Sequence, residues 1–230
     1  MRPALVLLPG TLCDARIFAH QRRALRDLAD VHALDYRQLR QVADWPAQLL
    51  QRLPERFSIA GFSLGGLWAL ELMRQAPERI ERVALIASNA RAAGAAARRK
   101  SAGLWRLWQR KGPDAVARRV KPAYFHHPQV RREQASVVRD MARQTGRDAA
   151  RAEFEWAARR PDGLGVLANF GGPVLLVSGA HDRLCPPAWQ REILQAQPAA
   201  RWLELPRVGH FVPMEAPGRL SAALRHWIQT

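Results

Sequence analysis

Cysteine is scarce in this 230-residue sequence, which contains only Cys13 and Cys185. One pair of cysteines cannot form a disulfide-rich scaffold, and neither position has the spacing of a zinc site. We therefore expect two free thiols and no bound metal. Hydrophobic residues (48%) and charged residues (24%) occur at ordinary levels, which excludes a disordered or fibrous chain.

Long hydrophobic runs are also missing. No stretch approaches the roughly 18 apolar residues that a membrane-spanning helix needs. The apolar run at residues 4–8 is too short for the core of a signal peptide. The expectation is a cytoplasmic protein that makes no membrane contact and has the size of one medium domain.

Lysine is rare as well, with three residues, so arginine supplies most of the net charge of +16. A basic surface can bind nucleic acid, an anionic membrane or an acidic protein, and it can also reflect genome composition alone. Residues 91–165 contain 18 Lys and Arg against 7 Asp and Glu, a net charge of +11. That charge is spread over several helical patterns, and no recognised nucleic-acid-binding motif accompanies it. We therefore expect no nucleic-acid partner.

Short apolar runs alternate with helical patterns over most of the chain. Uniformly apolar strands are typical of a parallel sheet with helices on both faces. Six such runs occur, at residues 4–8, 31–34, 57–61, 83–87, 173–178 and 201–205. Helical patterns lie at residues 16–28, 42–53, 64–75, 189–197 and 217–228. The sequence therefore predicts an α/β fold with about six parallel strands flanked by helices.

The alternation stops between residues 91 and 165, where no strand-like run occurs. Helical patterns cover residues 94–111, 113–120, 128–143 and 147–160. A helical excursion between two parallel strands indicates an inserted cap. We predict that residues 1–90 and 166–230 form the core domain and residues 91–165 the cap. The cap should lie over the carboxyl edge of the sheet, where ligands bind in open parallel sheets.

The segment Gly61-Phe-Ser-Leu-Gly-Gly66 joins an expected strand to an expected helix. In that context G-x-S-x-G is a nucleophile elbow, a strained turn that exposes the serine hydroxyl above the sheet. The glycines are needed because a side chain there would clash within the turn. Ser63 is therefore the candidate nucleophile.

A serine hydroxyl needs a base, and the base needs an orienting acid. The strand at residues 173–178 leads to Asp182, and the strand at residues 201–205 leads to His210. Each alone would be an ordinary loop residue. Their order, each after a late strand, predicts a catalytic triad of Ser63, His210 and Asp182. Such a triad needs no cofactor.

An oxyanion hole requires two backbone N–H donors. Leu64 follows the nucleophile, and Thr11 lies in the loop after the first strand, with Leu12 as the alternative to Thr11. Residues expected to line the substrate pocket are Leu12, Phe62, Trp105, Trp108, Tyr124 and Phe125. For Trp105 and Trp108, spaced for one helix face, contact within the core or between cap and core is the competing interpretation.

These motifs together resemble the α/β-hydrolase superfamily, in its capped branch of esterases, lactonases and carbon–carbon bond hydrolases. Residues 8–11 resemble the family's oxyanion loop, and residues 178–187 and 208–217 resemble its acid and histidine loops. Pro9 stands where the family often has histidine. The resemblance implies a small-molecule acyl substrate. Serine as the nucleophile argues against dehalogenases and epoxide hydrolases, which use aspartate.

Three functions remain open. The first is hydrolysis of a small carboxylic ester, thioester or lactone through an acyl-enzyme. The second is hydrolysis of an ester carried by an acidic acyl carrier protein docked on the basic cap. The third is a catalytically silent binding protein, against which the complete triad argues. Fold and triad alone do not identify the substrate.

Overall fold

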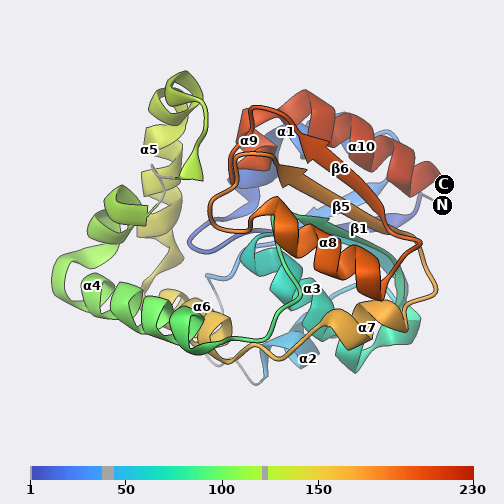
Figure 1. Cartoon of the computed structure of the whole chain (residues 1–230), viewed down its shortest axis with the longest axis horizontal. Coiled ribbons are helices and arrows are strands. Elements are labelled where there is room, and N and C mark those ends of the chain that lie inside the picture. The colour runs from blue at the N-terminus through green and yellow to red at the C-terminus, as the bar shows by residue number, and fades with distance from the viewer. Residues whose placement is uncertain (1, 38–43, 121–123) are drawn as a thin grey trace.

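A parallel sheet of six strands runs through the middle of the molecule (Figure 1). The structure, a computed structural model, describes residues 2–37, 44–120 and 124–230. Within these ranges the strand order is β2-β1-β3-β4-β5-β6, and every neighbouring pair is parallel. The strands are β1 (Ala4–Leu8), β2 (Asp30–Ala33), β3 (Phe57–Phe62), β4 (Ile80–Ile86), β5 (Val174–Gly179) and β6 (Arg201–Leu205). The predicted six-stranded parallel sheet is confirmed.

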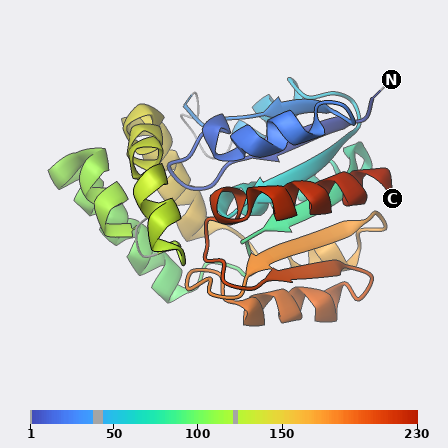
Figure 2. The same cartoon turned by 90° about the horizontal axis from the view of Figure 1, so that it is seen from above.

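Helices cover both faces of the sheet, because successive side chains of a strand point to opposite sides. In β1, Leu5 and Leu7 belong to one core cluster, and Val6 and Leu8 to the other. The first cluster is covered by α1 (Ala19–Leu25), α9 (Val212–Glu215) and α10 (Pro217–Gln229). The second is covered by α2 (Trp45–Leu50), α3 (Leu64–Gln75), α7 (Leu164–Ala168) and α8 (Pro187–Ala196). Figure 2 shows the layers from above.

Two predicted helices are shorter than their patterns. The pattern at residues 16–28 begins as a 3-10 turn, η1 (Ala15–Phe18), before α1, which ends at Leu25. The pattern at 42–53 becomes α2, which starts at Trp45 with Pro46 in its first turn, the position a helix tolerates; residues 42 and 43 lie outside the described residues. A second 3-10 turn, η2 (Pro77–Arg79), precedes β4.

Three long helices lie between β4 and β5, namely α4 (Ala95–Val120), α5 (Pro128–Thr145) and α6 (Arg147–Arg159). We call them the cap helices. They stand beside the carboxyl ends of the strands (Figures 1 and 2). Helix α4 is kinked where Gly112 adopts a φ of 75°, just before Pro113, so it matches the two expected helices. The boundaries 91 and 165 stay a prediction, and residue 165 lies inside α7, whose Leu167 packs in the core.

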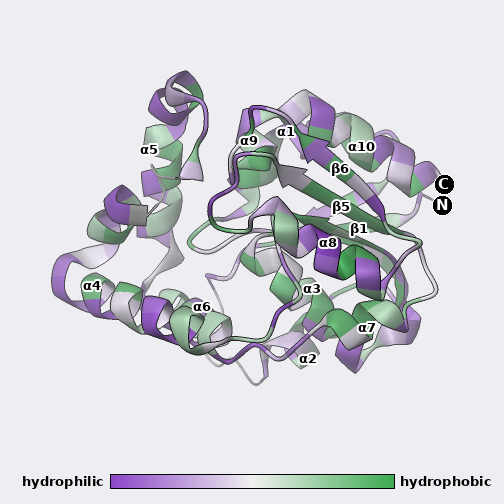
Figure 3. Cartoon of the chain, viewed as in Figure 1, coloured by the Kyte–Doolittle hydropathy of each residue, from purple (hydrophilic) through white to green (hydrophobic). Residues whose placement is uncertain are grey.

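Hydropathy follows this layering. In Figure 3 strands β1 and β5 are hydrophobic, whereas α4 and α5 carry extensive hydrophilic segments. Among the described residues, no helix combines the length and the apolar character that crossing a membrane requires.

Helix α3 starts so close to β1 that Gly65, in its first turn, has no room for a side chain. A Cβ atom on Gly65 would lie 2.0 Å from the backbone oxygen of Leu8, and one on Gly61 would lie 2.3 Å from the backbone oxygen of Gly65. Both neighbours are backbone atoms, so no side-chain rotation can relieve the overlap. Glycine at these two positions therefore permits the direct passage from β3 into α3.

We expect Gly65→Ala to destabilise the protein strongly, by on the order of 4 kcal/mol in the free energy of unfolding, because the backbones of α3 and β1 must move apart. Gly103→Ala is the matched control. Gly103 lies within α4 with no neighbour near its Cβ position, so alanine there should stabilise by about 0.5–1 kcal/mol. Urea unfolding measures both. Equal stability of Gly65→Ala and the unmodified protein would contradict the close approach.

Candidate active site

Ser63 occupies a strained turn between β3 and α3. Its φ of 52° and ψ of −113° are disfavoured for any residue with a side chain, and such strain must be held by surrounding contacts. The N–H of Ser63 donates to the backbone oxygen of Ile86 at 2.9 Å. The backbone oxygen of Ser63 accepts from the hydroxyl of Ser88 at 2.7 Å. Bonds to the end of β4 and the residues that follow it therefore hold the turn.

The three residues expected to form the triad lie in hydrogen-bonding order. Nε2 of His210 is 2.9 Å from Oγ of Ser63, and Nδ1 of His210 is 2.8 Å from Oδ2 of Asp182. His210 is 2% exposed and Asp182 is 3% exposed, so water competes little for these bonds. Distances of about 2.6–3.2 Å are those that proton transfer requires. The arrangement can move a proton from the serine hydroxyl to the imidazole.

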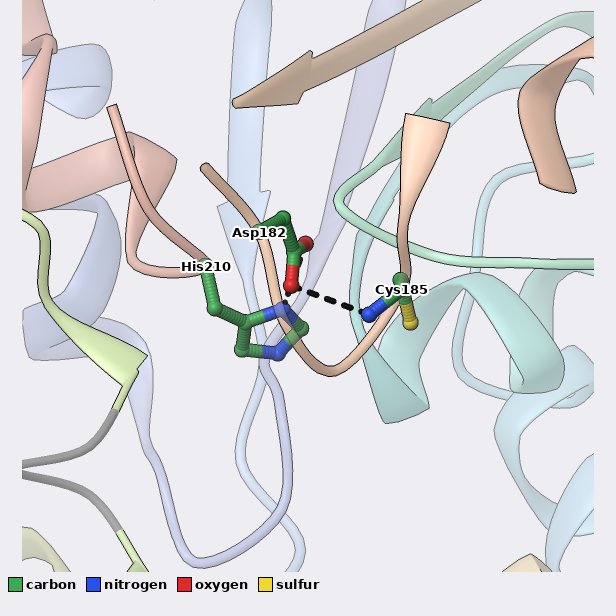
Figure 4. Close-up of side chains that lie close together, drawn as sticks. All are labelled: Asp182, Cys185 and His210. Carbon is green, nitrogen blue, oxygen red and sulfur yellow. Dashed lines mark hydrogen bonds and ion pairs between the residues drawn. The ribbon is translucent and has the colours of Figure 1, made fainter. Parts of the chain in front are cut away.

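The carboxylate of Asp182 is held on both of its oxygens (Figure 4). While Oδ2 faces His210, Oδ1 accepts from the backbone N–H groups of Leu184 at 2.8 Å and Cys185 at 2.9 Å. Asp182 is therefore fixed in the orientation that directs Nε2 of His210 toward the serine.

Asp182, Cys185 and His210 also form a cluster with the composition of a metal site, their candidate ligand atoms lying within 4.8 Å of one another. Asp182 and His210 are already engaged with each other. Burial raises the pKa of the Cys185 thiol to about 12, so its sulfur stays protonated near neutral pH and is a poor metal ligand. The cluster fits a hydrogen-bond relay better than a metal centre. Cys13 and Cys185 are both free thiols, which confirms the expectation that they form no disulfide.

The loop that carries His210 is fastened to the chain segment between α4 and α5. The N–H of His210 donates to the backbone oxygen of Tyr124 at 2.7 Å. The carboxylate of Glu215 accepts from the N–H groups of Gly209 at 3.1 Å, His126 at 2.7 Å and His127 at 3.1 Å. The position of the imidazole thus depends on residues of the predicted cap.

Two backbone amides remain available next to Ser63. Within the described parts of the chain, neither the N–H of Thr11 nor that of Leu64 donates to another residue. The loop of Thr11 lies against the elbow, since a Cβ on Gly10 would be 3.3 Å from the Cβ of Ser63. The N–H of Leu12, in contrast, donates to Oε2 of Glu153 at 2.6 Å. Leu64 and Thr11 are therefore the pair best suited to stabilise an oxyanion.

Glu153 is a site residue that the sequence did not reveal. It lies on α6, is fully buried, and its bond to Leu12 joins residues 141 positions apart. Leu12 has a positive φ of 53°, so the bond holds a strained residue directly after Thr11. Tyr36 holds the same loop from the core, through a 2.8 Å bond from its hydroxyl to the backbone oxygen of Pro9.

A cavity of about 370 Å³ opens above Ser63 and His210 and is lined by both core and cap residues. Leu12, Phe62 and Tyr124 line it, as expected of substrate-binding candidates. Trp105, Trp108 and Phe125 are not among its lining residues. Trp105 and Trp108 pack with Phe154 in a hydrophobic cluster of the cap, and Phe125 stacks on Phe211 at 4.4 Å. Their aromatic rings stabilise the cap and the histidine loop.

Comparison with known proteins agrees with this fold. A model of the alpha/beta hydrolase family matches residues 5–223. A pimeloyl-[acyl-carrier protein] methyl ester esterase of Neisseria meningitidis is 27% identical over 180 residues, which are 74% of this chain and 56% of that protein. The chain thus spans little more than half the length of this curated relative. It spans a fifth or less of two other curated relatives, a biotin biosynthesis bifunctional protein of Cellvibrio japonicus and a pimeloyl-[acyl-carrier protein] methyl ester esterase of Nitrosomonas europaea.

Solved structures share the fold over the whole chain. An enol-lactonase from Burkholderia xenovorans superposes with a TM-score of 0.83 and 25% identity, over 100% of this chain and 92% of its own. A thermophilic esterase from Thermogutta terrifontis has a TM-score of 0.87 at 23% identity, over 99% of this chain and 89% of its own. The second likeness concerns the fold alone.

We expect Glu153→Leu to lower kcat for ester hydrolysis by about 10- to 100-fold with little change in KM, because Thr11 would lose its fixed orientation and an oxyanion donor carries about that much rate. Glu153→Gln keeps an acceptor for the N–H of Leu12 and should stay within about threefold of the unmodified protein. Steady-state kinetics measure both.

The matched control is Glu155→Leu, on the same helix, where the carboxylate pairs with Arg151 at the surface. It should leave kcat unchanged. Equal losses in Glu153→Leu and Glu153→Gln would show that the bond to Leu12 is not what matters.

Proposed function

Because the chain belongs to the alpha/beta hydrolase family, we propose that it is a serine hydrolase that cleaves a carboxylic ester, thioester or lactone of a small molecule through an acyl-enzyme on Ser63. The observation that carries the proposal is the connected path from Ser63 through His210 to Asp182 at the base of a cavity. The family model shows that the chain belongs to the alpha/beta hydrolases. The serine mechanism is what we propose in addition.

In the first half of the reaction, Oγ of Ser63 attacks the acyl carbon while Nε2 of His210 accepts its proton. The N–H groups of Leu64 and Thr11 receive the negative oxygen of the tetrahedral intermediate. The intermediate collapses, the bond to the leaving alcohol breaks, and His210 returns the proton to that oxygen. The acyl group is then bound to Ser63 as an ester.

In the second half, His210 takes a proton from water, whose oxygen attacks the acyl carbon. The intermediate collapses again, releases the carboxylic acid and restores the proton to Ser63. Asp182 keeps its charge throughout and stabilises the imidazolium that forms twice in each cycle. The buried bond between His210 and Asp182 supports this role.

We expect Ser63→Ala to lower kcat for an active ester by about a millionfold, because members of a triad act as a unit. The thermal unfolding midpoint should stay close to that of the unmodified protein. A fluorophosphonate probe should label Ser63 in the unmodified protein, as seen by mass spectrometry of its peptides.

The matched control is Ser101→Ala, which removes a second hydroxyl from the lining of the same cavity and should keep activity within about tenfold. Activity of Ser63→Ala within tenfold of the unmodified protein would exclude the serine mechanism. A complete lack of esterase activity and labelling in the unmodified protein would favour the silent binding protein.

A second candidate function is hydrolysis of an ester presented by an acidic acyl carrier protein. The name of the Neisseria relative specifies such a substrate for that protein. In this chain a further cavity, of about 390 Å³, shares Lys100, Leu104 and Tyr124 with the cavity above Ser63. Arg99 and Arg119 line its remaining wall. Basic side chains at a cavity next to the one above Ser63 support a docking site for an acidic partner there.

If a carrier protein docks there, the double substitution Arg99→Glu and Arg119→Glu should raise KM for a carrier-linked ester by tenfold or more. It should leave hydrolysis of a small neutral ester unchanged. The effect should fade with added salt, because exposed charges are screened. The matched control reverses the charges of Arg22 and Arg23, two exposed residues of α1 in the core domain. Equal effects of the two double variants would exclude docking at this cavity.

A further inference from the structure

Every side chain with a full charge that lines the cavity above Ser63 is cationic, among the residues the structure describes. These side chains are Lys100, Arg160 and Arg183. No aspartate or glutamate accompanies them in the lining. The remaining wall is mostly apolar, with Leu67, Leu104 and Phe154 among its members. A neutral acyl chain would contact the apolar wall but would give the three cations no charged group to bind.

Arg160 is the least solvated of the three. It follows the last residue of α6 and is only partly accessible to solvent. Its Nε donates to the backbone oxygen of Arg91 at 3.0 Å, and its Nη1 donates to the backbone oxygen of Ala157. Both acceptors are neutral. In the described part of the chain, no carboxylate lies within ion-pair distance of Arg160.

A guanidinium removed from water without a counter-charge is costly, and it keeps its proton near neutral pH. Burial lowers the pKa of Arg160, and the group that opposes this shift is the Cys185 thiol. A thiol whose own pKa is about 12 is uncharged at neutral pH and supplies no counter-ion. Among the described residues, the lining of the cavity therefore supplies no negative charge to balance Arg160.

The cations line the same cavity as Ser63 and His210. Arg160, Lys100 and Cys185 line the same cavity, and the sulfur of Cys185 lies within 4.8 Å of the ligand atoms of His210 and Asp182. Lys100 also donates to the hydroxyl of Tyr124 at 3.0 Å, and the ring of Tyr124 is 5.5 Å from that of His210. An anionic group near Arg160 and Lys100 would thus belong to the same bound molecule as an ester at Ser63.

We propose that the preferred substrate carries a carboxylate in addition to the ester, as in a monoester of a dicarboxylic acid, and that Arg160 with Lys100 binds this carboxylate. The inference rests on the proposed esterase function. Arg160 supplies the less exposed donor, because a guanidinium presents several N–H groups and only two are directed at backbone oxygens. Lys100 is more exposed and completes the charge at the cavity wall.

The test compares the monomethyl esters of succinate, glutarate and adipate with methyl butanoate, pentanoate and hexanoate. Each monoester is paired with the neutral ester whose acid part has the same number of carbon atoms. Acid release in a pH-stat at low salt gives kcat/KM. We expect at least one monoester to be hydrolysed tenfold or more faster than its neutral partner. Arg160→Met should reduce this preference about tenfold or more while leaving the neutral ester within threefold. Arg160→Lys should recover part of the preference.

The matched control is Arg159→Met, the neighbouring exposed arginine of α6, which should leave both substrates unchanged. A preference for the neutral ester at all three lengths would overturn the proposal. An equal loss on both esters in Arg160→Met would assign Arg160 a purely structural role and would also overturn it.

Binding without turnover separates this proposal from the proposed function. Calorimetric titration of the Ser63→Ala variant with monomethyl adipate and with methyl hexanoate needs no catalysis. Tighter binding of the monoester, lost on adding Arg160→Met, would support the carboxylate site even if Ser63 were not the nucleophile. Equal binding of the two esters would reject the site even if Ser63 were confirmed.

Discussion

The close packing of α3 on β1 is the constraint on which the rest of the site depends. A Cβ atom on Gly65 would lie 2.0 Å from a backbone oxygen of β1. Because glycine has no Cβ, α3 can begin after a single residue, Ser63, beyond the end of β3. That geometry forces Ser63 to a φ of 52°. It also leaves the N–H of Leu64 at the open end of the helix, next to the loop of Thr11. The positions of the candidate nucleophile and of one candidate oxyanion donor thus depend on one backbone contact.

The cap helices do more than cover the cavity. Helix α6 supplies the carboxylate of Glu153 to the loop beside Ser63, and its end supplies Arg160 to the cavity wall. The segment before α5 accepts the N–H of His210. Trp156 of α6 stacks on Trp68 of α3 at 4.2 Å, which ties the same helix to the core. Movement of the cap would therefore alter the geometry of the oxyanion loop and the histidine loop together.

Local patterns were sufficient for the sheet and for the elbow. Uniformly apolar runs distinguish buried parallel strands, and all six were placed to within a few residues. Patterns were less informative for aromatic residues of the cap. A tryptophan at helical spacing indicates a buried face without indicating its partner. Pocket lining and a core or cap–core contact were therefore both open for Trp105 and Trp108, and the two residues pack in a cluster that joins the cap to Leu12. Helix α7 has five residues, too few to establish a helical period.

The sequence by itself determined the parallel fold, the inserted helices and the order of the candidate triad, because each leaves a signature within a few neighbouring residues. Only the tertiary structure revealed Glu153 on Leu12, Ser88 on the elbow, and Arg160 in the cavity without a carboxylate. These contacts join residues far apart in the chain, and a glutamate or arginine on a helix is by default a solvated surface residue. Burial decides otherwise, and burial is a property of how the helices pack.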